Sequence, residues 1–296
     1  MRNLTINLFK LMFILYFLAI QPVHTKDNNN ALKIEVTEFE QVESKLKSLN
    51  QKHGVEQVLV VLDIDNTILT SSVDLGGDVW YQWQRGKLEI KPSDDQKVKC
   101  LFEDSIGLLY ELLPMNLTEE DLSKRISNWQ KNGNTLMALT SRAPKYRAAT
   151  ERELAAANVD LEKTALAPKN GQIPIYREMK GRELSYMKGI MMTSGMNKGD
   201  MLEHILNKTN RSFKAIIFVD DSKKNIDNLY KKFKDSQNLE MYIYHYTRVE
   251  EARKEKHGSV ITSNQVKKMD DDWKKLNKVL NEIFPERNIG DACLSN

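Results

Sequence analysis

Cysteine is scarce in this chain of 296 residues, which contains two, Cys100 and Cys293. Two cysteines allow at most one disulfide, and they cannot supply a zinc site of the usual four-ligand kind. Cysteine spacing does not reveal whether two such residues pair, so the sequence leaves both possibilities open.

An excess of charge of one sign is also missing. The chain has 44 basic and 41 acidic residues, and loss of residues 1–25 would leave 42 basic and 41 acidic ones. Binding to the phosphates of a nucleic acid requires a strongly basic face. We therefore expect no nucleic-acid partner. The sequence also contains no internal repeat and no low-complexity tract.

The sequence lacks an apolar run long enough to cross a bilayer, which takes about 20 residues. Its longest run covers residues 11–20, with Arg2 and Lys10 before it and Pro22 after it. This pattern is typical of a signal peptide. We expect residues 1–25 to be a signal segment, the only part in contact with a membrane, and the protein to be periplasmic or secreted. A buried N-terminal helix is the alternative.

Short apolar runs at residues 58–62, 135–139 and 215–219 are typical of strands buried on both faces of a parallel sheet. Residues 239–246 are a further strand candidate, and residues 173–192 read as a hairpin turning at Lys180 and Gly181. Helices are predicted over residues 34–52, 94–113, 118–132, 144–157 and 264–284. The fold class is therefore α/β, and the length suits one large domain with an insertion or two small domains.

Two carboxylates follow each of two predicted strands. Asp63 and Asp65 come after the first run, and Asp220 and Asp221 come after the third. Open α/β sheets bind ligands at the carboxyl ends of their strands. Carboxylates held close together repel unless a cation or a shared proton relieves them. Helix capping or a turn accounts for one Asp in a pair, but not for two.

The acidic pairs belong to a longer ordered pattern. Thr140 ends the second strand, and Lys198 lies at the start of a helix, where a cation opposes the helix dipole. This pattern resembles the four motifs of the haloacid dehalogenase superfamily over roughly residues 55–230. The residues that carry the resemblance are Asp63, Asp65, Thr67, Thr140, Lys198, Asp220, Asp221 and Asn225.

The resemblance implies a doubly wound, Rossmann-like parallel sheet formed by residues 26–70 and 134–296. A small helical cap, residues 71–133, would be inserted after the first motif. It also implies a magnesium-dependent phosphate-ester hydrolase that acts on a small phosphorylated substrate, because superfamily phosphatases carry an acid at the position of Asp65. The sequence indicates neither the identity of the substrate nor the oligomeric state. The alternatives are a binding or effector protein on the same scaffold, and a phosphotransferase with the same site.

Each site residue has an implied role. Asp63 would be the nucleophile that forms an aspartyl-phosphate, and Asp65 the general acid and base. Thr140 and Lys198 would bind the phosphoryl oxygens. Mg²⁺ would be held by Asp63, the backbone carbonyl of Asp65 and Asp221, with Asp220 either a further ligand or a supporting residue.

Three features have two interpretations each. Arg142 either reaches a phosphate or faces solvent. Trp80, Tyr81 and Trp83, a cluster just beyond the first acidic pair, either pack in the core or contact substrate. The apolar stripe of residues 264–284 either packs against the parent domain or mediates dimerisation.

Overall fold

The computed structural model describes residues 30–172, 175–287 and 293. The expected signal segment, residues 1–25, lies outside the described residues. Within the described part of the chain, no helix combines the length and the apolar character needed to cross a membrane.

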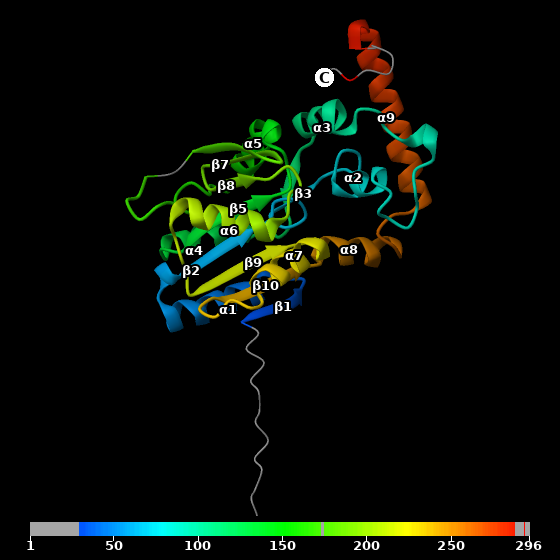
Figure 1. The fold of residues 1–296 in the computed structure, drawn as a ribbon. Coiled ribbons are helices and arrows are strands. Elements are labelled where there is room, and N and C mark those ends of the chain that lie inside the picture. The colour runs from blue at the N-terminus through cyan, green and yellow to red at the C-terminus, as the bar shows by residue number, and fades with distance from the viewer. Residues whose placement is uncertain (1–29, 173–174, 288–292, 294–296) are drawn as a thin grey trace, which may run out of the picture.

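A single eight-stranded sheet forms the centre of the molecule (Figure 1). In spatial order, the first six strands are parallel to one another. The seventh strand pairs antiparallel with the sixth, and the eighth pairs antiparallel with the seventh. In spatial order the strands are β1 (Ala31–Val36), β10 (Glu240–Tyr246), β9 (Ala215–Asp220), β2 (Val58–Leu62), β5 (Thr135–Thr140), β8 (Ile190–Met192), β7 (Arg182–Met187) and β6 (Tyr176–Lys180). The predicted α/β class, with a largely parallel sheet, is confirmed.

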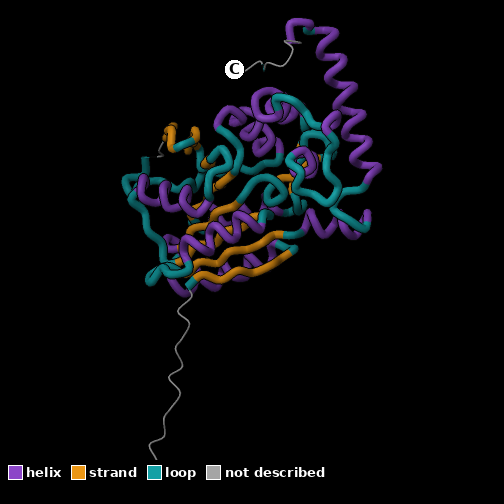
Figure 2. Tube along the Cα trace, turned by 45° about the vertical axis from the view of Figure 1, so that its right-hand side comes forward, coloured by secondary structure: helices purple, strands orange, loops and turns teal. Residues whose placement is uncertain are grey.

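Helices cover both faces of this sheet (Figure 2). Alternate residues of β2 point to opposite faces: Val58 and Val60 pack in one apolar cluster, Leu59 and Val61 in the other. The first cluster is completed by α1 (Phe39–His53), α4 (Leu122–Lys131) and α5 (Arg147–Ala156). The second is completed by α6 (Lys198–Thr209) and α7 (Lys223–Phe233). Because both faces are covered, every residue of β2 and β9 is buried.

A third apolar cluster lies beyond the carboxyl ends of the parallel strands (Figure 1). It joins α2 (Asp78–Gln84) and α3 (Ile106–Leu112) to α9 (Ser263–Ile283), which follows α8 (Arg248–His257). A short antiparallel ribbon of β3 (Leu69–Ser71) and β4 (Met115–Leu117) begins and ends the segment that carries α2 and α3. Of the expected cap, residues 71–133, α2 and α3 lie over the strand ends, whereas α4 packs on the sheet.

The aromatic cluster divides between two environments. Trp80 and Trp83 are fully buried in the third apolar cluster, and the rings of Trp80 and Trp273 lie 6.2 Å apart. Tyr81 is half-buried, and its ring packs edge-on against Phe102. The two tryptophans are therefore packing residues, and Tyr81 alone of the three keeps an accessible side chain.

The apolar stripe of α9 packs against the parent domain through its first half. Val266 and Met269 are buried, whereas Val279, Ile283 and Phe284 are exposed. Both views show the end of α9 extending away from the sheet (Figure 1, Figure 2).

Several local predictions differ from the structure. The helix expected from residue 34 begins at Phe39, because residues 31–36 pair with β10 as an edge strand. The helix expected over residues 94–113 is regular only over Ile106–Leu112, after a backbone reversal at Cys100 with φ of 53°. The helix expected from residue 118 begins at Leu122, and the hydroxyl of Thr118 donates to the carbonyl of Thr67. The predicted hairpin is present as β6 and β7, but β8 pairs parallel with β5. The missed strand β1 and the parallel pairing of β8 both depend on residues distant in sequence.

Cys100 and Cys293 form a disulfide, which resolves the alternatives that the sequence left open. Their Cα atoms lie 5.6 Å apart although 193 residues separate them in sequence. The bond ties the C-terminal region to the segment that precedes α3.

Candidate active site

Four of the residues predicted to act together meet at the carboxyl edge of the sheet. Asp63 follows β2 directly, and its backbone N–H donates to the carbonyl of Val219 at 2.9 Å, so the strand pairing continues to this residue. Thr140 ends β5 and Asp220 ends β9, the two strands that flank β2. Lys198, the first residue of α6, joins them from the helical layer. Parallel strands end at one edge, so residues distant in sequence converge there.

Lys198 is the electrostatic centre of this arrangement. Its Nζ lies 2.8 Å from Oδ1 of Asp63 and donates to Oδ2 of Asp220 at 2.6 Å. The side chain is completely buried. Burial alone would lower the pKa of this ammonium group, but the carboxylates of Asp220 and Asp63 outweigh burial and raise it. Lys198 therefore remains a cation at neutral pH.

A cap explains how a cation is held at the beginning of α6. The side-chain oxygen of Asn197 accepts hydrogen bonds from the backbone N–H groups of Gly199 and Asp200. These bonds satisfy two of the donors that a helix leaves free at its start. The two carboxylates facing Lys198 then offset the unfavourable position of its charge in the helix dipole.

Asp220 is fully occupied by its neighbours. Besides Lys198, it accepts hydrogen bonds from the backbone N–H of Ser222 at 2.9 Å and from Nδ2 of Asn225 at 3.0 and 3.2 Å. A carboxylate bound on both oxygens inside the protein has little capacity left for a metal ion. The geometry therefore favours a positioning role for Asp220, which holds Lys198 against Asp63.

Asp221 belongs to a second group of side chains connected through Asn66. Nδ2 of Asn66 lies within hydrogen-bond distance of Asp221 at 3.2 Å and of Asp78 at 3.1 Å. Thr70 donates to Oδ1 of Asn66, which fixes the orientation of the amide. Asn66 has a φ of 54°, a left-handed conformation that Asn tolerates better than most residues. The sequence analysis did not identify Asn66 or Asp78 as site residues.

Asp65 is paired with Arg142. Nε and Nη2 of the guanidinium donate to the two carboxylate oxygens at 2.9 and 2.7 Å, in the bidentate geometry that arginine favours. Arg142 is buried, donates to Thr150 and lies over the ring of Tyr110. The expectation that Arg142 faces solvent is wrong, and the side chain contacts a predicted catalytic acid.

The acidic residues repel one another. Oxygens of Asp63, Asp220 and Asp221 all lie within 4.8 Å of one another. Burial raises the pKa of Asp63 to about 8, with the carboxylates of Asp220 and Asp65 adding to the effect and Lys198 opposing it. Burial, Asp78 and Asp220 likewise raise the pKa of Asp221 well above its ordinary value.

Burial and the charge of Asp65 raise the pKa of Asp78 to about 6.

Among the described residues, Lys198 is the only cation in direct contact with Asp63. Oxygen ligands with an excess of negative charge suit a hard divalent cation, which would relieve this repulsion.

The residues missed from the sequence had only weak local signals. Asn66 lies inside the Asp63-to-Thr67 motif, but an Asn in a turn is ordinary. Asp78 follows two glycines and is the first residue of α2. An acid is common at this position, because its negative charge interacts favourably with the helix dipole. Its place beside Asp221 depends on how α2 packs over the strand ends.

Comparison with known proteins places the chain in a family. A family model described as "Protein of unknown function (DUF2608)" matches residues 35–286. A protein of Chlamydia pneumoniae named "Putative outer membrane protein" is 26% identical over 174 residues, 58% of this chain and 62% of that relative. The chain thus spans less than two thirds of the length of this relative.

The family match corrects the expectation drawn from the sequence motifs. The assignment to the haloacid dehalogenase superfamily is wrong, because the family model that covers most of the chain is a different one. The chain belongs to the family described as "Protein of unknown function (DUF2608)".

Proposed function

We propose that the protein is a magnesium-dependent phosphate-ester hydrolase with Asp63 as its nucleophile. The observation that carries the proposal is the buried Lys198, which lies 2.8 Å from Asp63 and 2.6 Å from Asp220 at the carboxyl edge of the sheet. A carboxylate beside a fixed cation, with further acids to bind a metal ion, suits the transfer of a phosphoryl group.

The reaction has two steps. A carboxylate oxygen of Asp63 attacks phosphorus, the bond to the ester oxygen breaks, and an aspartyl-phosphate forms. Water then attacks phosphorus and releases phosphate with Asp63 regenerated. Lys198 neutralises phosphoryl charge in both steps, and the hydroxyl of Thr140 donates to a phosphoryl oxygen. Asp220 keeps the ammonium group of Lys198 in place.

Asp65 moves the proton in both steps. It protonates the leaving oxygen and later takes a proton from the attacking water. Arg142 donates to both oxygens of Asp65 in this structure, and each oxygen keeps a second lone pair that can exchange a proton. Arg142 thereby orients the acid and limits its motion.

The carboxylate of Asp63, the backbone carbonyl of Asp65 and the carboxylate of Asp221 are the oxygen ligands that would hold Mg²⁺. When bound, the ion would supply positive charge that keeps Asp63 ionised and neutralises the phosphoryl group. The raised pKa values of Asp63 and Asp221 support this part of the proposal, because burial and, after it, the neighbouring carboxylates disfavour negative charges that a cation would stabilise.

The fold supports a covered site. The parallel sheet with helices on both faces would serve as a doubly wound, Rossmann-like core, and α2 and α3 would act as a cap above the strand ends. A cap excludes water and contacts the leaving group. Tyr81 is a suitable contact, because it is half-buried on α2, the helix that also carries Asp78.

We place the protein in the cell envelope or outside the cell, acting there on a small phosphorylated substrate. The disulfide between Cys100 and Cys293 supports this location, since such bonds persist in oxidising compartments. The name of the Chlamydia pneumoniae relative is consistent with an envelope location.

Hydrolysis of p-nitrophenyl phosphate tests the proposal. We expect turnover with Mg²⁺ that chelation by EDTA abolishes. Asp63→Asn, which is nearly isosteric, should lower the rate by at least about a thousandfold with an unchanged circular dichroism spectrum. The matched control is Asp200→Asn, an exposed acid in the first turn of α6 that should leave the rate unchanged. Retention of substantial activity by the Asp63 variant would refute the assignment of the nucleophile.

A further inference from the structure

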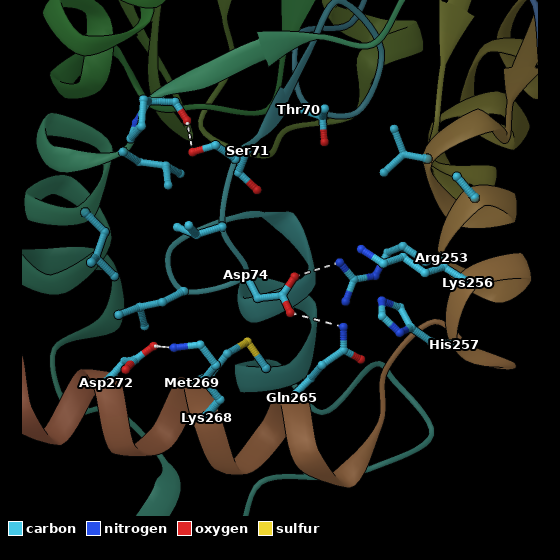
Figure 3. A pocket seen from close by; sticks show the side chains of 18 of the residues that line it. Thr70, Ser71, Asp74, Arg253, Lys256, His257, Gln265, Lys268, Met269 and Asp272 are labelled. Atoms are coloured by element: carbon cyan, nitrogen blue, oxygen red, sulfur yellow. Dashed lines mark hydrogen bonds and ion pairs between the residues drawn. The ribbon is translucent and has the colours of Figure 1, made fainter.

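A cavity of about 900 Å³ lies between β3 with its following loop and the helices α3, α8 and α9 (Figure 3). Cavities that hold small ligands commonly measure about 300–1,000 Å³. None of the acidic residues of the candidate active site lines it, and neither does Lys198. Thr70, which donates to Asn66, also lines the cavity, but the inference drawn from the cavity does not rest on the proposed function.

Much of the cavity wall is apolar. Leu109 and Leu112 come from α3, and Met269 and Leu276 come from α9. Leu112 is 57% exposed and Val73, in the loop after β3, is 55% exposed. Apolar side chains gathered around a cavity are stabilised when an apolar group displaces water from them.

The acidic side chains that line the cavity are already paired. Asp74 accepts from Nη1 of Arg253 at 2.7 Å and from Nε2 of Gln265 at 3.2 Å, as Figure 3 shows. Asp272 is bound by Lys268 at 2.7 Å. Among the residues that the structure describes, no other acid lines the cavity. The negative charges of the wall are thus neutralised by neighbours.

Basic groups of the wall exceed these acids. The side chains of Lys256 and His257, at the end of α8, make no hydrogen bond or ion pair with any residue that the structure describes. Nη2 of Arg253 is buried and has no acceptor among those residues. Figure 3 shows all three side chains on the same side of the cavity. A helix C-terminus favours cations, which accounts for basic residues there but not for a buried guanidinium nitrogen without an acceptor.

We propose that this cavity binds a single-chain amphiphile with an anionic head group. The acyl chain lies along the leucines of α3 and α9. The head group lies at the end of α8, where Lys256, His257 and Nη2 of Arg253 supply donors. A carboxylate and a phosphate monoester are the two head groups that match these donors, and a neutral head group does not.

Isothermal titration calorimetry with dodecanoate, below the concentration at which it forms micelles, tests the proposal. We expect one site per chain. Dodecyl phosphate is the second arm, and the tighter of the two ligands identifies the head group. Dodecyl maltoside, with the same chain and a neutral head, should bind at least about tenfold more weakly, because charge-assisted hydrogen bonds contribute on the order of 1.4 kcal/mol or more.

Two matched pairs of variants locate the site. Lys256→Met should weaken binding of the anionic ligands about tenfold, whereas Lys254→Met, on the same helix but outside the cavity and paired with Glu250 and Glu251, should not. Leu112→Ser should weaken all three ligands severalfold, whereas Ile283→Ser, equally exposed but distant on α9, should not.

Each replaced side chain in these variants is exposed, so we expect all four proteins to fold. Absence of binding by both anionic ligands would overturn the proposal. Equal affinity for dodecyl maltoside and for the tighter of the two anionic ligands would also overturn it, and so would equal effects of the Lys254 and Lys256 substitutions.

Discussion

Replacement of Lys198 by Met tests whether the cation is the centre of the site. The substitution keeps most of the buried stem but leaves Asp63 and Asp220 facing each other without their cation. The side chains of Lys198 and Asp220 are completely buried and that of Asp63 is 8% exposed, so water cannot take over the lost contacts. Removing one partner from a buried ion pair costs about 3–5 kcal/mol, and we expect that loss in the free energy of unfolding at pH 7.

Urea unfolding followed by tryptophan fluorescence measures this loss, with EDTA present so that no metal ion replaces the ammonium group. Lys208→Met is the control on the same helix, because Lys208 lies 2.7 Å from Glu178 but is 41% exposed, and its loss should cost less than about 1 kcal/mol. Adding Asp220→Asn to Lys198→Met removes a buried carboxylate that has lost its cation and should recover about 1–3 kcal/mol. A Lys198 variant no less stable than the Lys208 variant would refute the reasoning.

Four further predictions concern other parts of the molecule. Replacing both Cys100 and Cys293 by Ser should lower the free energy of unfolding by about 2–5 kcal/mol, and the same denaturation assay would contradict this if the variant matched the wild type. Burial raises the pKa of Asp78 to about 6, so its carboxylate costs stability as pH rises from about 4 to 6. Asp78→Asn should therefore be more stable than the wild type by about 3 kcal/mol at pH 7 and nearly equal to it at pH 4, and a pH-independent difference would exclude this cause. Trp80→Ala should lower the free energy of unfolding by about 3–5 kcal/mol. Tyr81→Ala should instead raise KM for bulky phosphate esters but not for acetyl phosphate. An unchanged ratio of the two KM values would count against a substrate contact of Tyr81.

The sheet could be predicted from the sequence because its central strands are buried on both faces. Val58–Leu62 is apolar at every position, and the same holds for the run that becomes β9 up to its final residue, Asp220. The edge strand β1 was missed, because only the first and last residues of Ala31–Val36 are buried and its pairing depends on β10, more than 200 residues away in sequence. Local pattern therefore predicts buried strands better than edge strands.

The candidate site could likewise be predicted only in part from the sequence. Asp63, Thr140 and Asp220 could be placed together because each ends or follows a predicted parallel strand. The contacts of Arg142 and Asp78 could not, because they depend on side-chain direction and on the packing of α2. The pairing of Cys100 with Cys293 likewise depends on a long-range approach that spacing does not encode.

The central claim, a covalent phosphoryl group on Asp63, can be measured directly. Protein turning over a phosphate ester with Mg²⁺ would be quenched in acid, digested and analysed by mass spectrometry, with the Asp65→Asn variant used to slow hydrolysis of the intermediate. The account predicts a peptide containing Asp63 with the added mass of one phosphoryl group, which hydroxylamine removes. Turnover with no such adduct in either protein, or with the adduct on another residue, would contradict it.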